Sequence, residues 1–136
     1  MEKQDFKTLN YVVSAAILIS LITVTAMCVI PRAILISLYE ETEPYLDLAI
    51  RYTLEGNNPL AHEKIETAVE NMEKSRKTLM LFYDHTGILE LTGSIETALL
   101  LSETDDAAQL IEELKDAKKT FEFLIHADDI SIYNIF

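Results

Sequence analysis

One uncharged run, residues 8–31, constrains the fold of this chain more than any other feature. It reads TLNYVVSAAILISLITVTAMCVIP and contains no Asp, Glu, Lys or Arg. A helix needs roughly 20 apolar residues to cross the hydrocarbon core of a bilayer, which is about 30 Å thick, and residues 11–30 meet that length. Hydroxyl side chains in the run can donate to carbonyls one turn earlier, so they are tolerated in lipid. We therefore predict a transmembrane helix over residues 11–31.

The residues at the two ends of this run suit the membrane surfaces. Tyr11 stands where an aromatic ring favours the interface, and the long side chain of Arg32 can reach the headgroups. A cleaved signal peptide is an alternative, but its apolar region would be only about 7 to 15 residues long. A lipoprotein signal ending at Cys28 would need a small residue where Met27 stands, and a buried helix of a soluble protein would need a larger domain around it. The residues expected to mark a retained anchor are Tyr11, Leu18, Leu21, Ile30 and Arg32.

Charge is distributed unevenly along the chain. Residues 1–39 carry three basic and two acidic side chains, whereas residues 40–136 carry eight basic and twenty-one acidic ones, a net charge of −13. Such a domain should repel nucleic acid and anionic lipid, and basic partners or divalent cations suit it better. Basic residues near the ends of an anchor set its orientation, and Lys3 and Lys7 precede the run while only Arg32 follows it. We expect residues 1–10 to be a cytoplasmic tail and residues 32–136 to be an acidic helical domain outside the membrane.

Apolar residues recur at helical spacing through residues 32–136, without the alternation of a strand. Three breaks interrupt them: GNNP at residues 56–59, DHTG at 84–87 and TDD at 104–106. The helices should run to about residue 55, over 60–83, over 88–102, and from 107 onward, and short connections make neighbouring helices antiparallel. The predicted fold is all-α, with one N-terminal transmembrane helix followed by a small antiparallel four-helix bundle of two helical hairpins. The predicted core positions are Ile34, Leu35, Leu38, Tyr45, Leu48, Tyr52, Ile65, Ala68, Val69, Met72, Leu79, Phe82, Ile88, Leu91, Ile95, Ala98, Leu99, Ser102, Leu110, Ile111, Leu114, Ala117, Phe121, Leu124 and Ile125.

Individual residues give sharper expectations. Pro31 should end or kink the anchor, or start the next helix, and Pro44 leaves open an interruption of that next helix. Asn58 should cap the second bundle helix, with a proline in its first turn. Gly93 implies either that the third helix begins one residue later or that two helices approach closely at this point. The apolar residues among 130–136 should pack on the bundle.

No catalytic motif is present in the sequence. A P-loop, a Gly-rich dinucleotide turn, a zinc-protease H-E-x-x-H and a serine nucleophile elbow are all absent, so we predict no enzymatic activity and no cofactor. The candidate metal ligands are His85 and His126, which could share an ion with Glu90 or Glu122 if they met across the bundle. Helix capping and the helix dipole explain both histidines without a metal, and that is the interpretation we adopt.

Several segments resemble a known family. LFYDH at residues 81–85, LIH at 124–126 and the final Asn134, Ile135 and Phe136 are similar to the bacterial membrane proteins grouped as domain of unknown function 4363, and the resemblance covers nearly the whole chain. The chain departs from that family in having no tryptophan, and in having Gly87 and Leu89 where members often have acidic residues. The resemblance implies an anchored helical protein of the bacterial cell membrane, with the final tripeptide as a possible interaction or packing signature.

The combination of an anchor, an acidic bundle and no catalytic motif leads to two functional hypotheses. The first is a non-enzymatic protein that acts in protein–protein interaction or as an accessory subunit. It would bind the lipid bilayer through its N-terminal helix and would bind either a membrane-protein partner or a second copy of itself. The alternative is an extracytoplasmic sensor of a small ligand or a divalent cation, in which the acidic surface, His85 and His126 would form the receptor.

Overall fold

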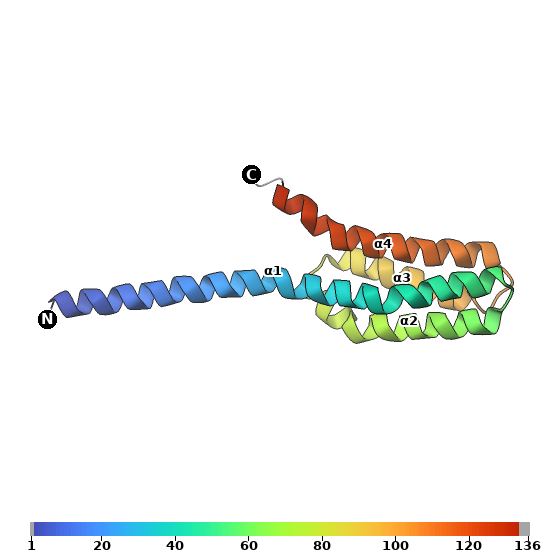
Figure 1. The fold of residues 1–136 in the computed structure, drawn as a ribbon, viewed down its shortest axis with the longest axis horizontal. Coiled ribbons are helices and arrows are strands. Elements are labelled where there is room, and N and C mark those ends of the chain that lie inside the picture. Colours follow the sequence, from blue (N-terminus) through green and yellow to red (C-terminus); the bar gives the residue numbers. More distant parts are fainter. Residues whose placement is uncertain (1, 134–136) are drawn as a thin grey trace.

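A computed structural model describes the backbone of residues 2–133 and the side chains of residues 10–127. This part of the chain forms four helices and no strand (Figure 1). They are α1 (Glu2–Leu54), α2 (Asn58–Leu79), α3 (His85–Leu101) and α4 (Ala107–Tyr133). The all-helical prediction is therefore confirmed for the described residues. The predicted signature of Asn134, Ile135 and Phe136 lies outside them, as do the side chains of residues 130–136 that were expected to pack on the bundle.

The first helix, α1, is continuous over 53 residues and contains both Pro31 and Pro44 in its interior. Of the alternatives predicted for Pro31, a helix end or a helix start does not occur, and no interruption occurs at Pro44. A proline inside a helix removes one hydrogen bond and crowds the carbonyl four residues earlier. Pro44 and Glu40 both lie on the exposed side of α1, so water can hydrate the carbonyl of Glu40 that the missing N–H leaves free. Pro31 is buried, and packing of the flanking turns outweighs its unfavourable helix propensity.

The second half of α1 packs with the other three helices in a helical bundle. Among the described residues α1 contacts α2 and α4, α3 contacts the same two helices, and neither α1 with α3 nor α2 with α4 is in contact. The α1–α2 and α3–α4 connections lie at one end of the bundle, here called the distal end (residues 55–57 and 102–106). The α2–α3 connection lies at the other, proximal end (residues 80–84), from which the first half of α1 projects (Figure 1).

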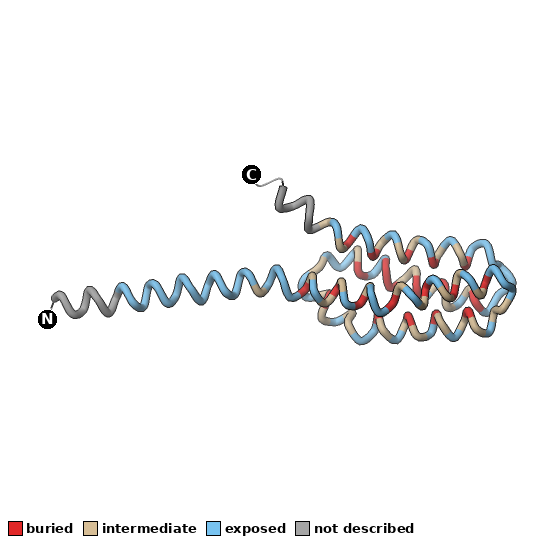
Figure 2. Tube along the Cα trace, viewed as in Figure 1, coloured by how far each residue is buried: buried red, intermediate tan, exposed pale blue. Residues whose placement is uncertain are grey.

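The core runs along the inside of the bundle (Figure 2), and most of the predicted core positions on α2, α3 and α4 are buried in it. Phe82 is an error of prediction: its side chain is 44% exposed, because α2 ends at Leu79, four residues before the predicted end at residue 83. Beyond Leu38, the buried residues of α1 lie one position later in the chain than predicted. Tyr45, Leu48 and Tyr52 are only half-buried, and the fully covered residues are their neighbours Leu46, Ala49 and Thr53 together with Thr42.

The connection between α1 and α2 is a glycine-terminated helix end. Gly56 has φ +73°, its N–H bonds to the Thr53 carbonyl at 3.1 Å, and the N–H of Asn57 bonds to the Tyr52 carbonyl at 2.8 Å. This pair of bonds is a Schellman motif, which favours glycine at the left-handed position. Asn57 then caps α2, because its Oδ1 accepts from the Leu60 N–H at 3.4 Å. The predicted cap, Asn58, was thus one residue too late.

The start of α3 differs from what was predicted for Gly93. Asp84 caps α3, with Oδ2 accepting from the N–H of Gly87 at 3.4 Å, so the helix begins at His85 and Gly93 lies in its interior. A Cβ placed on Gly93 would meet nothing within 4 Å, so neither alternative proposed for Gly93 holds. The close approach of two helices occurs instead at Gly87, where a Cβ would lie 2.8 Å from Cδ2 of Leu124 on α4.

Candidate functional site

The apolar first half of α1 has almost no protein around it. The large apolar side chains of residues 11–30 expose between 48% and 76% of their surface, and the part of the chain that the structure describes has one helix long and apolar enough to cross a bilayer. Inside it, the hydroxyls of Thr23 and Thr25 donate to carbonyls four residues earlier, each at 2.8 Å, as predicted for hydroxyls in lipid. Of the predicted anchor residues, Tyr11, Leu18, Leu21 and Ile30 are exposed and Arg32 is half-buried.

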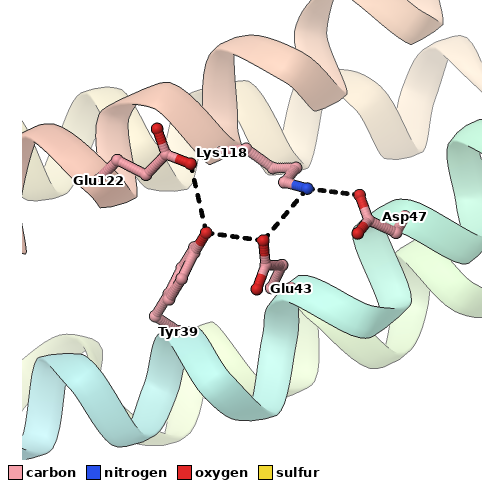
Figure 3. A network of polar contacts seen from close by, with 5 residues as sticks. All are labelled: Tyr39, Glu43, Asp47, Lys118 and Glu122. Carbon is pink, nitrogen blue, oxygen red and sulfur yellow. Dashed lines mark hydrogen bonds and ion pairs between the residues drawn. The ribbon is translucent and has the colours of Figure 1, made fainter.

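A polar network ties α4 to the bundle half of α1 (Figure 3). The Lys118 ammonium lies between two carboxylates of α1, 3.2 Å from Glu43 Oε1 and in hydrogen-bond contact with Asp47 Oδ1. Tyr39 donates to Glu43 Oε1 at 2.7 Å, and its hydroxyl lies 3.4 Å from Glu122 Oε1. The network therefore gathers three carboxylates around one lysine and one tyrosine.

The surroundings of this network shift the proton affinities of its members. Burial raises the pKa of Tyr39 strongly, and the hydrogen bond to Glu43 and the negative charges of Glu43 and Glu122 raise it further. Burial alone would lower the pKa of Lys118, but its bonds to Asp47 and Glu43 and their charges outweigh burial and raise the pKa above its usual value. Both groups are thus held in their protonated forms.

The network was only partly visible in the sequence. Lys115, Lys118 and Lys119 lie close together on α4, and Lys115 and Lys119 are exposed, whereas Lys118 is half-buried. Tyr39, Glu43 and Asp47 recur at every fourth residue, as do Lys118 and Glu122, so each set lies on one helix face. That spacing was the available signal. In the fold Lys118 lies between Glu43 and Asp47, where it neutralises part of the negative charge that would otherwise attract a cation.

A second polar cluster joins α2 to α3 at the distal end. His62 Nδ1 lies 2.7 Å from Ser102 Oγ, and His62 Nε2 lies 3.5 Å from Glu66 Oε1. This contact between serine, histidine and carboxylate resembles a nucleophilic site in composition. The Ser102 hydroxyl also lies 2.6 Å from the Leu99 carbonyl, which can only accept. The single hydroxyl proton therefore goes to Leu99, and Ser102 accepts from Nδ1–H of His62. His62 is therefore not positioned to take the serine proton as a general base would. The contact instead holds α2 and α3 together.

The two histidines singled out by the sequence lie toward the proximal end of the bundle. His85 is the first residue of α3 and His126 follows Leu124 by two residues on α4, and both side chains are exposed. Glu122 faces Tyr39, while Glu90 lines a groove between α3 and α4. Within the described residues, no group of three or more His, Cys, Asp or Glu side chains is arranged to hold a metal ion.

A groove with polar and apolar walls lies between α3 and α4 on the flank of the bundle. Its walls are formed by Glu90, Ser94, Asp116, Lys119, Thr120 and Phe123. The ring of Phe123 is 68% exposed, and Leu89 on α3 is 47% exposed. Aromatic side chains are enriched at protein interfaces, whereas Lys, Glu and Asp are depleted there. The exposed ring of Phe123 is therefore the feature of this groove that suits contact with another protein.

Comparisons of the chain with family models, with curated proteins and with solved structures found no match, and the resemblance to domain of unknown function 4363 stays a prediction.

Proposed function

We propose that this chain is a single-pass membrane protein in which α1 both crosses the bilayer and forms part of an antiparallel four-helix bundle of two hairpins, α1–α2 and α3–α4. The observation that carries the proposal is the contrast between the two halves of α1. Large apolar side chains up to Ile30 are exposed, whereas Leu35 and Leu46 further along the same helix are fully buried. A continuous apolar surface of this size is stable in lipid and unfavourable in water. The contact pattern of the helices and the positions of their connections support the antiparallel arrangement.

The proposed orientation has the N-terminal tail in the cytoplasm and the bundle outside, in the membrane of a bacterial cell. Lys3 and Lys7 against Arg32 support it. Lys74 and Lys77 also lie near the proximal end, but they follow the span by far more than the roughly 15–20 residues within which basic side chains set orientation. The test is a single cysteine at Leu100 in a Cys28→Ser chain. Labelling of intact cells by a membrane-impermeant maleimide supports the orientation, and labelling only after lysis contradicts it.

The proposed activity is non-enzymatic: binding of a membrane-protein partner, or of a second copy, as an accessory subunit. The side chains that could best act as acids, bases or nucleophiles already bond to other groups of the protein. Lys118 pairs with Glu43 and Asp47, and His62 bonds to Ser102. The α3–α4 groove with exposed Phe123, in contrast, remains open to another molecule. These observations favour a binding surface over a reaction centre.

The partner is tested by site-specific crosslinking in native membranes. A photo-crosslinking amino acid replaces Phe123, and the matched control carries it at Leu54, an apolar residue of similar exposure (72%) at the distal end. After gentle detergent extraction and mass spectrometry, a stoichiometric crosslinked membrane protein or dimer at position 123, and none at 54, supports the proposal. A chain that extracts alone, without a crosslink at either position, contradicts it.

The alternative is an extracytoplasmic sensor of a small ligand or a divalent cation, and the net charge of −13 over residues 40–136 is what favours it. Its cation form is tested by thermal melting of the full chain in detergent with calcium, zinc or manganese. A rise in Tm that disappears in His85→Ala and His126→Ala would assign the cation to those histidines. No rise with any of the three metals would eliminate the cation form.

A further inference from the structure

The bundle begins at the residue where the apolar span ends. Ile30 is 53% exposed, the next residue, Pro31, is buried, and Leu35 one turn later is fully covered. Because α1 is one continuous helix, no flexible linker separates the span from the bundle. If α1 crosses the bilayer as proposed above, the proximal end of the bundle must lie against the membrane surface.

The α2–α3 connection lies level with the end of the span. Ser75 of α2 lines a groove together with Ile34 and Ser37 of α1, which sets these parts of the two helices side by side. From Ser75, α2 runs toward the span (Figure 1), and the four residues to Leu79 advance about 6 Å at 1.5 Å per residue. An equal distance back along α1 from this groove reaches about residue 31. The connection that follows Leu79 is thus at the level of the headgroups.

The conformation of the connection directs two large apolar side chains outward. Met80 and Tyr83 pack against the core, while Leu81 between them is 79% exposed and Phe82 is 44% exposed. Backbone bonds fix this arrangement: the N–H of Phe82 bonds to the Leu79 carbonyl at 3.0 Å and the N–H of Tyr83 bonds to the same carbonyl at 2.9 Å. Leu81 and Phe82 are therefore presented by an ordered turn, with little entropy left to lose on insertion.

The end of α2 carries a short basic stretch, unlike the domain as a whole, whose net charge is −13. Residues 74–83 read KSRKTLMLFY, with three basic and no acidic side chains, while Glu73 and Asp84 flank them and Arg76 pairs with Glu73 at 2.8 Å. Lys74 and Lys77 are exposed, and they precede the apolar turn by one to two helical turns. Basic residues followed by aromatic and aliphatic ones suit the boundary between lipid phosphates and acyl chains. The repulsion of anionic lipid expected from the domain as a whole does not apply to this stretch.

We propose that the α2–α3 connection is a second membrane contact, which inserts Leu81 and Phe82 into the interfacial region of the bilayer that α1 crosses and holds Lys74 and Lys77 against lipid phosphates. The proposal rests on the proposed membrane anchoring. Its consequence is that the bundle is held at two points, so it does not swing freely about the end of the span.

The chain has no tryptophan, so a single introduced tryptophan reports its own surroundings. Four full-length variants are reconstituted into phosphatidylcholine–phosphatidylglycerol vesicles with and without lipids brominated on their acyl chains. Leu81→Trp and Phe82→Trp probe the connection at two independent positions. Leu21→Trp is the control inside the span, and Leu100→Trp, at an exposed leucine of the distal end (68%), is the control in water.

The expected result is a blue-shifted emission and strong quenching by brominated lipid at positions 81 and 82, less than at position 21 but well above position 100. Quenching at 81 and 82 no greater than at 100, with position 21 strongly quenched, would overturn the second contact and leave the anchor intact. Absence of quenching at position 21 as well would overturn the anchor and the second contact together. Far-UV circular dichroism of each variant verifies that its helix content matches that of the unmodified chain.

Discussion

Thr42 provides the sharpest test of the packing of α1. Its side chain is fully buried, and its Oγ1 has no hydrogen-bond partner among the described residues. Two other buried threonines provide matched controls. Thr53 donates to the Ala49 carbonyl at 2.8 Å, and Thr92 donates to the Ile88 carbonyl at 2.7 Å. Valine has nearly the shape of threonine, so Thr42→Val replaces an unpaired hydroxyl with a methyl group and leaves the packing unchanged.

The expected effect of Thr42→Val is a gain in stability. Mutational data give about 1–3 kcal/mol as the cost of burying an unpaired hydroxyl, and a further buried methyl group contributes about 0.8 kcal/mol. The helix propensities of Thr and Val are similar, so the two contributions add and the free energy of unfolding should rise by about 2–4 kcal/mol. At Thr53 and Thr92 the same methyl gain is offset by the loss of a hydrogen bond that contributes about 0.5–1.5 kcal/mol, so those valine variants should change stability little.

The assay is urea and thermal unfolding of the full chain in detergent, followed by far-UV circular dichroism. For a domain of this size each kcal/mol corresponds to a rise of about 4–8 °C in Tm, so the Thr42→Val effect is readily measured. Equal changes in all three valine variants would refute the reasoning, because the three hydroxyls would then have the same surroundings. A loss of stability at Thr42→Val alone would show that its hydroxyl has a partner in the native protein.

Three further predictions concern the network, the glycines and the core. The raised pKa values of Tyr39 and Lys118 mean that the folded state holds both protons more tightly than the unfolded state does. Their contribution to stability is complete below about pH 10 and is lost as the pH rises further, and Tyr39→Phe should reduce this alkaline loss by up to about 1.4 kcal/mol per pH unit in urea titrations between about pH 9 and pH 12. Gly93→Ala should stabilise α3 by about 0.5–1 kcal/mol, since a Cβ there meets nothing within 4 Å. Gly87→Ala should gain less or lose stability, since its Cβ would displace the buried Leu124 of α4. Equal shifts in Tm for the two variants would contradict this contact. Phe121→Ala should cost about 3–5 kcal/mol because Phe121 is fully buried, and a loss in the same melts below about 0.5 kcal/mol would place it at the surface.

The helices and most of the core could be predicted because they depend on local periodicity. Ile88, Leu91 and Ile95 on α3 follow one stripe, and it is buried. On α1 the same reasoning selected Tyr45, whereas the buried residue is Leu46. A prediction from sequence favours large apolar side chains as core residues. The centre of a close helix interface instead accepts small side chains such as Ala49, and the bulkier tyrosine rings lie on either side of that interface. Which residues of α1 face the core therefore depends on where the neighbouring helices lie. The periodicity of α1 alone carries no information about those positions.

The polar contacts were harder to predict because they join segments far apart in the chain. Lys118 and Asp47 are separated by 71 residues, and their pairing requires the axial register of α4 against α1. Spacing within each helix places Tyr39, Glu43 and Asp47 on one face, but it does not say which residue of another helix lies opposite. The bond between His62 and Ser102 depends likewise on how α2 lies against α3.

The continuity of α1 also bears on which molecules can reach the proposed binding surface. Residues 31–54 of α1 rise about 36 Å at 1.5 Å per residue, so an anchored bundle extends roughly that far from the membrane. The α3–α4 groove includes Glu90 and Ser94, which follow the start of α3 at His85 by five and nine residues and so lie about 8 and 14 Å from the proximal end. A bundle fixed by α1 and by Leu81 and Phe82 would hold this groove in the half nearer the bilayer. A membrane protein with a short extramembrane part could reach Phe123 there, whereas the distal end, with Leu54 and Leu100, would be accessible only to larger domains or soluble proteins. A crosslink at position 123 therefore indicates a membrane partner, and a crosslink at position 54 indicates a larger or soluble one. No crosslink at either position indicates a chain without a bound partner.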